Sequence, residues 1–308
     1  MAEELRNAYG KTLAKLVAEN ENIVVLDADL SKSTKTYEAK KVAPERHFNA
    51  GIAEANMIGM AAGLAASGKT VFASSFAIFA AGRAFEIIRN SVCYPHLNVK
   101  VCASHAGLCV GEDGASHQAI EDIAIMRSLP NMQVFVPSDA LEAAAIIEHV
   151  AKIDGPCYVR MGRGKVEDVY AEGHQFNIGK ADLLKKGSKV CLFATGLMVQ
   201  EAIKASETLK ESGLDVSICN ISCLKPLDVE GVLNIAKEHE YCFALEEHNI
   251  MGGFFSTLAE ALIPYNVTKL FPIGVNDTFG ESGKSKDVLN KYGICADHIV
   301  EVVKATVR

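Results

Sequence analysis

The chain has 308 residues, of which 49% are hydrophobic and 22% charged, and its formal net charge is −7. This is ordinary globular composition, and the length suits two domains, because a single core stops growing at roughly 250–300 residues. The acidic balance argues against nucleic-acid binding, which needs a basic surface. No apolar run is long enough to span a membrane, and the first residues do not resemble a signal peptide, so we expect a cytoplasmic protein.

The nine cysteines are an odd number, and most of them lie in apolar, strand-like runs, as Cys102, Cys191 and Cys242 do. Such cysteines behave as small buried hydrophobic residues in a reducing compartment. Cys219 and Cys223 are the closest pair in the sequence, but no second pair of metal ligands follows them. A structural zinc site is therefore not expected.

Apolar residues with helical spacing predict a first helix at 5–17, which a short buried strand at 23–26 follows. Helices and strands then alternate as far as residue 160. Further strands are predicted at 70–75, 98–103, 133–136 and 157–160, and helices at 52–67, 80–93, 117–128 and 139–151. Continuous apolar strands separated by helices indicate a parallel sheet with both faces covered.

Residues 166–186 are polar and without clear periodicity, and we interpret them as a linker. The alternation then resumes, with strands predicted at 189–194, 215–220, 241–245 and 269–273 and a last helix at 295–307. The sequence thus predicts an α/β fold with two domains, each based on a parallel sheet, at 1–165 and 187–308.

The most specific segment, Gly111–Glu121, follows a predicted strand and a glycine-containing loop. Ligands of open parallel sheets bind beyond the carboxyl ends of the strands. His105, Asp113 and His117 are therefore candidate site residues. The alternative is a turn in which Asp113 and Ser116 cap a helix that begins near His117.

The run Gly-Glu-Asp-Gly-Ala-Ser-His-Gln at 111–118 resembles the signature Gly-Glu-Asp-Gly-x-Thr/Ser-His-Gln of transketolases. Residues 127–132, Arg-Ser-Leu-Pro-Asn-Met, resemble a second transketolase segment. The resemblance covers essentially the whole chain and implies a pyrimidine-binding domain followed by a transketolase C-terminal domain. It further implies thiamine diphosphate as cofactor, sugar phosphates as substrates and transfer of a two-carbon ketol unit in pentose phosphate metabolism.

The segment at 49–57 carries Glu54 near the start of an apolar helix. By spacing alone, Glu54 would only complement the helix dipole. The resemblance implies that Glu54 hydrogen-bonds N1′ of the cofactor's aminopyrimidine, with a pKa raised by its apolar site. Transketolases commonly have Arg before and His after this glutamate, where this chain has Ala53 and Ala55. Asn56 stands where deoxyxylulose-phosphate synthases have His.

Phe76 and Phe79 follow a predicted strand, and on general grounds such aromatic residues belong to the core. The resemblance implies instead that they pack on the pyrimidine ring of the cofactor. It also implies that Asp29, at the end of the first strand, lies near the cofactor at a subunit junction. The cofactor-binding residues of the prediction are Glu54, Phe76, Phe79 and Asp29.

Recognition of a phosphate needs fixed cations, for which guanidinium groups are best suited. The resemblance assigns Arg163, Arg6 and Ser33 to the substrate phosphate, although Arg6 could equally be a solvated helix residue. It assigns Asp113 to the C2 hydroxyl of the incoming aldose. His105 and His117 would bind the donor's hydroxyl groups and shuttle their protons. The predicted catalytic residues are Glu54, His105 and His117.

The family holds the diphosphate and the metal with a Gly-Asp-Gly motif, which this sequence lacks. We therefore expect no metal ligands here, and expect Mg²⁺ or Ca²⁺ to be held by a partner that carries the N-terminal transketolase domain. The chain resembles the C-terminal subunit of a split transketolase. The expected assembly has two copies of each subunit, and the chain alone should show no turnover.

Two rival interpretations remain. One is a related enzyme, a deoxyxylulose-phosphate synthase or the β subunit of a 2-oxo-acid dehydrogenase, although Glu112 and Asp113 fit transketolase better. The other is a non-catalytic partner subunit, against which the presence of Glu54 argues. In the second domain, glycines at 252–253 that open a helix could hold an anion. We favour a structural role there, as the resemblance implies for this domain, which builds the dimer.

Overall fold

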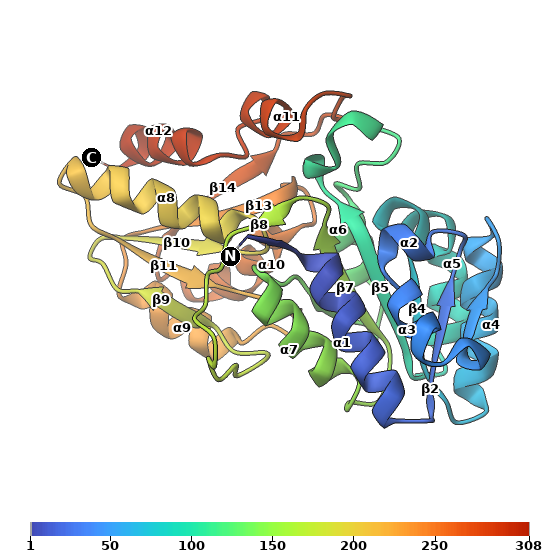
Figure 1. The fold of residues 1–308 in the computed structure, drawn as a ribbon. Helices are drawn as coiled ribbons and strands as arrows, with labels where there is room; N and C mark the ends of the chain where they lie inside the picture. Colours follow the sequence, from blue (N-terminus) through green and yellow to red (C-terminus); the bar gives the residue numbers. More distant parts are fainter. Residues whose placement is uncertain (1, 308) are drawn as a thin grey trace.

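The computed structural model describes residues 2–307 and shows two α/β domains side by side (Figure 1). The first domain is built on a seven-stranded sheet with the strand order β12-β6-β7-β5-β4-β2-β3. All neighbouring strands in it are parallel except β12, which is antiparallel to β6. The strands are β2 (Ile23–Asp27), β3 (His47–Asn49), β4 (Thr70–Phe76), β5 (Val99–Ala106), β6 (Gln133–Phe135), β7 (Cys157–Gly162) and β12 (Cys223–Lys225).

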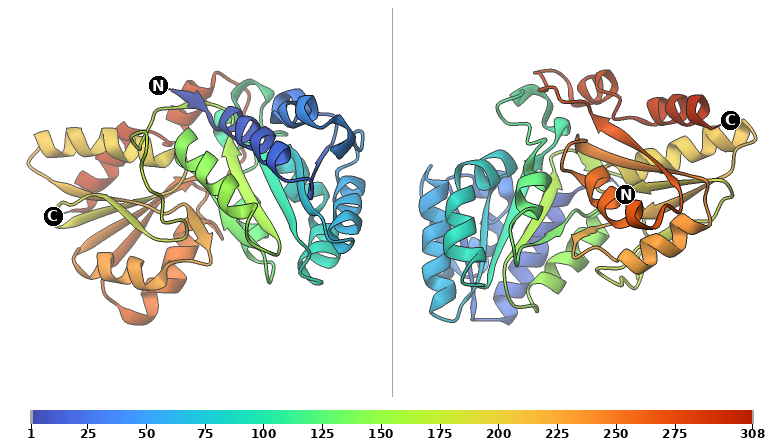
Figure 2. Two further views of the ribbon diagram at one scale, coloured as in Figure 1. Left: turned by 60° about the horizontal axis from the view of Figure 1, so that its bottom comes forward. Right: turned by 180° about the vertical axis from the view of Figure 1, so that it is seen from behind.

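Helices cover both faces of this sheet, as Figure 2 shows from two further sides. Apolar side chains of α1, α3 and α7 pack on one face, and those of α4, α6 and the helical segment between β4 and β5 pack on the other. The α-helices are α1 (Leu5–Glu19), α2 (Ser31–Thr34), α3 (Tyr37–Val42), α4 (Glu54–Ala66), α5 (Phe85–Ile87), α6 (Asp122–Arg127) and α7 (Ala140–Val150). The 3₁₀ segments are η1 (Pro44–Arg46) and η4 (Leu108–Asp113), and the π-helical turns are η2 (Ile78–Arg83) and η3 (Ile88–Cys93).

The second domain has a five-stranded sheet with the order β14-β13-β10-β11-β9, parallel except for β9. Helices α8 and α12 pack on one face, and α9 and α10 pack on the other. The strands are β9 (Asp182–Lys185), β10 (Val190–Ala194), β11 (Val216–Asn220), β13 (Tyr241–Asn249) and β14 (Lys269–Val275). The helices are α8 (Met198–Glu211), α9 (Val229–Lys237), α10 (Phe254–Leu262), η5 (Ile263–Tyr265), α11 (Ser285–Lys291) and α12 (Ala296–Thr306).

These two sheets confirm the predicted fold class, but the helix predicted at 117–128 begins only at Asp122. Two contacts explain the late start. Ala119 pairs with Ala106 at the end of β5, and the carbonyl of Ile120 accepts a hydrogen bond from the Asn249 backbone N–H. Residues 119–120 are thereby drawn out of helical geometry. The predicted capping role of Ser116 is wrong, because its hydroxyl instead lies 3.0 Å from Nδ1 of His117.

The segment predicted as a linker is tied to both domains. Asp139 caps α7 and also accepts hydrogen bonds from the backbone N–H groups of Val169 and Tyr170. Farther along, β9 joins the second sheet, while β12 of the second half completes the first sheet. The two sheets therefore do not take their strands from two separate stretches of the chain. The domain boundaries at 165 and 187 stay predictions.

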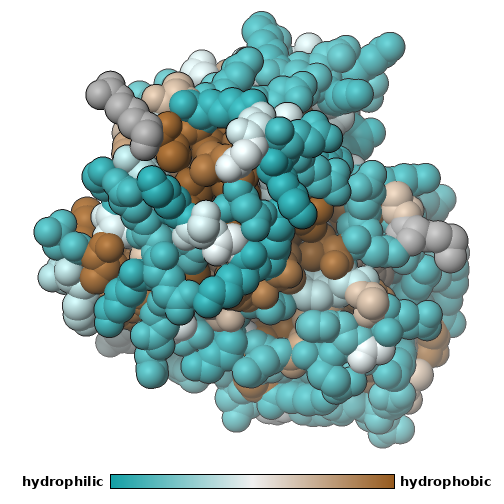
Figure 3. Space-filling model, turned by 90° about the vertical axis from the view of Figure 1, so that its left-hand side faces the viewer, coloured by the Kyte–Doolittle hydropathy of each residue, from teal (hydrophilic) through white to brown (hydrophobic). Residues whose placement is uncertain are grey.

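Eight of the nine cysteines are buried, and Cys295 is partly exposed. Cys219 and Cys223 belong to different apolar clusters, because the chain turns between β11 and β12. Within residues 2–307, no helix is long and apolar enough to cross a membrane. Figure 3 shows the side of the second domain that lies farthest from the first, where hydrophilic side chains separate small apolar patches.

Candidate active site

The predicted site residues gather at one edge of the first sheet. Strands β7, β5, β4, β2 and β3 are parallel neighbours, so their carboxyl ends meet at the same edge, where ligands of such sheets bind. Each of these strands is followed or ended there by a predicted site residue: Ser33 after β2, Glu54 after β3, Phe76 at the end of β4, His105 near the end of β5 and Arg163 after β7.

Four rings form the centre of this edge. Phe76 stacks on His105 with a centroid separation of 3.8 Å, and Phe79 lies 6.0 Å from Phe76. His117 meets Phe79 edge-on, with centroids 5.2 Å apart. The two predicted histidines and the two predicted phenylalanines are thus one cluster, although they come from three segments of the chain.

His105 is held in an unusual conformation. Its φ of 57° lies in the left-handed region, which a residue other than glycine adopts only where its surroundings impose it. Its Nδ1 lies 2.9 Å from the hydroxyl of Ser104. Burial, and then the positive charges of Arg6 and Arg163, lower the pKa of His105 to about 3. The imidazole is therefore neutral at physiological pH and can both donate and accept a hydrogen bond.

Two arginines flank His105 because the start of the chain returns to the same edge. A two-residue ribbon, β1 (Glu3–Glu4) against β8 (Lys165–Val166), places the beginning of α1 beside the end of β7. Nη1 of Arg6 donates to the carbonyl of Ser33 at 3.1 Å. Nη1 of Arg163 donates to the carbonyl of Val110 at 2.7 Å and lies 3.5 Å from a carboxylate oxygen of Asp113.

Glu54 is the first residue of α4 and only 3% of it is exposed. Nη1 of Arg83 lies 3.3 and 3.4 Å from its two carboxylate oxygens. The same guanidinium covers the ring of Phe79, with Cζ 4.2 Å from the centroid. Arg83 therefore links the glutamate to the aromatic cluster and brings a guanidinium to Glu54, which follows Ala53 in the chain.

The residues at this edge suit the aminopyrimidine part of thiamine diphosphate. A buried carboxylate and two aromatic rings lie together, and the buried hydroxyl of Ser75, beside Phe76, has no hydrogen-bond partner in residues 2–307. Asp29 also has a left-handed φ, of 62°, and its carboxylate accepts from Nδ2 of Asn49 at 3.0 Å. Within residues 2–307, no group of three His, Cys, Asp or Glu side chains is placed to hold a metal ion.

Sequence reasoning missed three contributors to this site. Arg83 lies 29 positions from Glu54 in the sequence and carries no local signal. Ser104 could have been noticed, because both histidines directly follow a serine whose hydroxyl contacts Nδ1. The third is Glu247 in the second domain, whose carboxylate accepts from the backbone N–H of Cys109 at 2.6 Å.

Acidification should destabilise the protein through His105. The folded-state pKa is about 3, below the ordinary value of 6.5, so an unfolded chain takes up a proton there in a window where the folded chain does not. Stability is thus retained above pH 6.5 and lost as the pH falls toward 3, by up to about 1.4 kcal/mol per pH unit. Over about two pH units below 6.5, the free energy of unfolding of His105→Asn should therefore fall by roughly 2 kcal/mol less than that of the wild type.

The measurement is chemical denaturation at several pH values. The control is His298→Asn, because this partly exposed histidine of α12 lies apart from the site, 3.6 Å from Glu301. His105 is unchanged in this variant, so the pH dependence that its buried imidazole produces should remain. Identical slopes for His105→Asn and the wild type would contradict the neutral, buried state of His105.

Two family models match the chain: "Transketolase, pyrimidine binding domain" at residues 2–168 and "Transketolase, C-terminal domain" at residues 179–299. The fold and the clustered residues therefore define a protein with a pyrimidine-binding domain followed by a transketolase C-terminal domain. The chain belongs to the transketolase family, which confirms the resemblance seen in the sequence, and this family depends on thiamine diphosphate.

Three similar proteins carry names that refer to a section, a subunit or a split gene. A putative transketolase C-terminal section from Methanocaldococcus jannaschii is 49% identical, over 96% of this chain and 94% of that protein. A 6-deoxy-6-sulfo-D-fructose transketolase subunit from a Clostridium species is 38% identical, over 96% and 92%. A solved structure of a split-gene transketolase, described as an inactive β4 tetramer, is 49% identical with a TM-score of 0.91, covering 99% of this chain and 98% of that one.

Proposed function

We propose that this chain is the pyrimidine-binding subunit of a thiamine-diphosphate-dependent transketolase, which transfers a two-carbon ketol unit from a ketose phosphate to an aldose phosphate. The observation that carries this proposal is the meeting of Arg6, Ser33, His105 and Arg163 next to the aromatic cluster and Glu54. Residues that suit a phosphate group thereby lie beside residues that suit an aminopyrimidine ring.

In this proposal Glu54 hydrogen-bonds N1′ of the aminopyrimidine, and Phe76 and Phe79 pack on its ring. Thiamine diphosphate, when bound, supplies the carbon nucleophile of ketol transfer. Arg83 lies against both carboxylate oxygens of Glu54, and its side chain is 55% exposed, so it has room to move aside when the pyrimidine takes its place. Asp29, tied to Asn49, would lie beside the cofactor at the junction of subunits.

The substrate groups have separate tasks. Arg6 and Arg163, with the Ser33 segment, bind the phosphate, while Asp113 accepts a hydrogen bond from the C2 hydroxyl of the aldose. His105 and His117 contact the hydroxyl groups of the donor. Because His105 is neutral, it holds hydroxyl protons by hydrogen bonding and adds no positive charge to the phosphate site.

A partner subunit would complete the enzyme. The similar proteins named above are a C-terminal section, a subunit and a split-gene product. By analogy, a second chain with a Gly-Asp-Gly motif would hold the diphosphate and Mg²⁺ or Ca²⁺, and two copies of each chain would form a heterotetramer. The described inactivity of the split-gene tetramer of β chains agrees with a chain that shows no turnover by itself.

In this proposal Arg163 binds the phosphate group of the substrate. Replacing it by glutamine removes a guanidinium that can bind two phosphate oxygens, so the KM for a ketose phosphate should rise on the order of tenfold to a hundredfold. The KM for an unphosphorylated ketose should change little. Steady-state kinetics of the reconstituted complex with both donors measures this, and an equal rise for both would remove Arg163 from the phosphate site.

The proposal is tested by a ketol-transfer assay with xylulose 5-phosphate and ribose 5-phosphate, thiamine diphosphate and Mg²⁺. This chain, a candidate partner with the Gly-Asp-Gly motif, and their mixture are assayed separately. We expect turnover only in the mixture. A parallel series uses 6-deoxy-6-sulfo-D-fructose as donor, and another uses pyruvate. Turnover only with the sulfo sugar would mean that this sugar, and not a ketose phosphate, is the donor. Decarboxylation of pyruvate without ketol transfer would overturn the proposal.

A further inference from the structure

The loop that leads to Asp113 and His117 touches the second domain at each of its three glycines. A Cβ added to Gly107 would overlap the carboxyl group of Glu247, and one added to Gly114 would overlap the hydroxyl of Ser282. At Gly111 it would lie 3.1 Å from the carbonyl oxygen of Gly283. All three glycines have positive φ values. The loop backbone therefore lies directly against β13 and the chain that precedes α11.

Glu247 is the strongest link across this contact. It lies in β13, is 3% exposed, and its Oε1 accepts from the backbone N–H of Cys109 at 2.6 Å. Its own backbone carbonyl accepts from Nη2 of Arg160 at 3.0 Å. Glu247 is thus fixed to the first sheet at one end and holds the start of the loop at the other.

Gln118 forms a second link just after the loop. Its Nε2 donates to the carbonyl of Glu281 at 3.0 Å and lies within 3.5 Å of the carbonyls of Leu108 and Gly111. The side chain is 3% exposed. One amide group therefore joins the start and the middle of the loop to the segment that precedes α11.

We propose that the second domain is part of the catalytic apparatus, with Glu247 and Gln118 as positioning residues that hold the substrate loop, residues 107–114, and so place Asp113. The inference rests on the proposed function and goes beyond the structural, dimer-building role expected for this domain. Neither residue touches the substrate. A loop released from them would still carry Asp113, but not at a fixed distance from Arg163 and His105.

The test compares two adjacent buried carboxylates of β13. Glu247 contacts the loop, whereas Glu246 accepts from the backbone N–H groups of Phe254 and Phe255 at the start of α10. In the reconstituted complex, Glu247→Ala should raise the KM for the aldose acceptor on the order of tenfold to a hundredfold. Glu247→Gln keeps a hydrogen-bond acceptor, so its KM for the aldose should lie close to the wild-type value. Glu246→Gln, which leaves the loop contacts in place, should keep the wild-type KM.

Hydrogen exchange of the full-length chain gives a readout that does not need activity. The backbone amides of residues 107–114 should exchange faster in Glu247→Ala than in Glu246→Gln or the wild type. If the wild-type complex transfers no ketol unit, the proposed function fails while this measurement still tests the loop contact. Unchanged exchange at 107–114 together with an unchanged KM would overturn the inference. Should Glu247→Ala not fold, Gln118→Ala takes its place with the same two outcomes.

Discussion

Glu54→Gln should abolish ketol transfer by the reconstituted complex while the chain remains folded, and Glu54→Ala should do the same. Glutamine has nearly the shape of glutamate but cannot release or take up a proton beside the aminopyrimidine, so the rate should fall by roughly 10²–10⁴-fold or more. The fold should tolerate the change, because within residues 2–307 the Glu54 carboxylate pairs only with Arg83, whose side chain is 55% exposed and can turn to solvent. Turnover of the mixture and thermal unfolding of the variant measure the two effects.

The matched control is Glu45→Gln, which removes an exposed carboxylate that pairs with the neighbouring Arg46. It should change neither turnover nor stability. A Glu54→Gln complex that keeps activity within about tenfold of the wild type would be too active for a catalytic role. The non-catalytic interpretation of this chain would then be preferred.

Asp122→Ala should destabilise the protein by about 3–5 kcal/mol, the usual cost of leaving one charge of a buried ion pair alone. Asp122 is fully buried and accepts from Nε of Arg160 at 2.9 Å and from the hydroxyl of Tyr158 at 2.7 Å. Burial acts to lower the pKa of Arg160, but Asp122 and Glu247 outweigh it, so the guanidinium stays charged. Without Asp122, that charge would lose its nearest partner.

The free energy of unfolding from chemical denaturation measures this cost. For comparison, Glu148→Ala breaks the exposed pair between Lys15 and Glu148 and should destabilise the protein far less, because solvent screens such a pair. Equal effects in the two variants would mean that the buried pair adds no more than a surface pair. Because Arg160 also holds Glu247, the Asp122→Ala variant should loosen the substrate loop as well.

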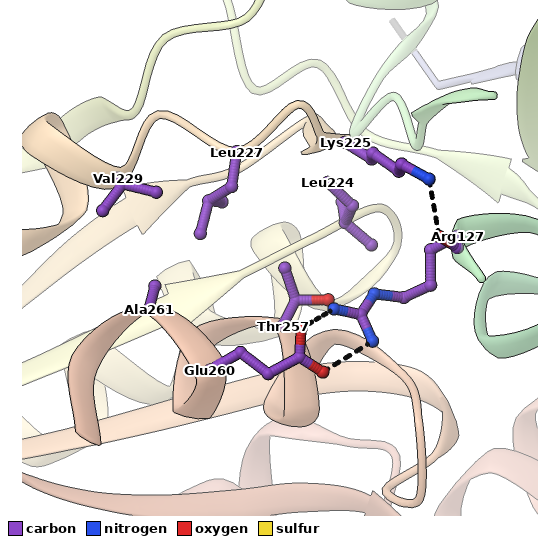
Figure 4. Close-up of a pocket in the computed structure, with 8 residues that line it drawn as sticks. All are labelled: Arg127, Leu224, Lys225, Leu227, Val229, Thr257, Glu260 and Ala261. Atoms are coloured by element: carbon purple, nitrogen blue, oxygen red, sulfur yellow. Dashed lines mark hydrogen bonds and ion pairs between the residues drawn. The ribbon is translucent and has the colours of Figure 1, made fainter. Parts of the chain in front are cut away.

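The junction of the domains combines such buried pairs with exposed ones. An open pocket with a volume of about 340 Å³ lies at the rim of this junction. In it, Arg127 of α6 forms two hydrogen bonds with the carboxylate of Glu260 in α10 (Figure 4). The ammonium group of Lys225 binds the carbonyl of Arg127 at 2.8 Å and that of Leu129. Both cations are thus engaged with protein groups, and we interpret this pocket as part of the domain contact.

Glu246 explains why the glycines at 252–253 do not form an anion site. They precede α10, and the buried Glu246 carboxylate already accepts from the N–H groups of Phe254 and Phe255. Burial raises the pKa of Glu246 to about 8, although these two N–H groups act in the opposite direction. The protein's own side chain thus occupies the start of the helix, in line with the structural role favoured from the sequence.

The sequence by itself determined the order of strands and helices, because burial on both faces leaves continuous apolar runs and helices leave a periodic pattern. It also determined the family, since the signature at 111–118 is a local feature of the chain. Because the carboxyl ends of parallel strands share one edge, it further indicated where the site lies. Short elements with few apolar residues escaped it: β3, β9 and β12 each have three or four residues.

Only the tertiary structure decided which distant groups meet. Arg83 reaches Glu54 across 29 positions, and Glu247 reaches Cys109 across 138, and neither contact leaves a pattern in the sequence. The late start of α6 has the same origin, because Asn249 and Ala106 hold residues 119–120 outside the helix. Helix propensity acts within a few neighbouring residues, whereas these contacts exist only once distant parts of the chain have packed. Those of Arg83 and Ala106 form within the first domain, and those of Glu247 and Asn249 form between the domains.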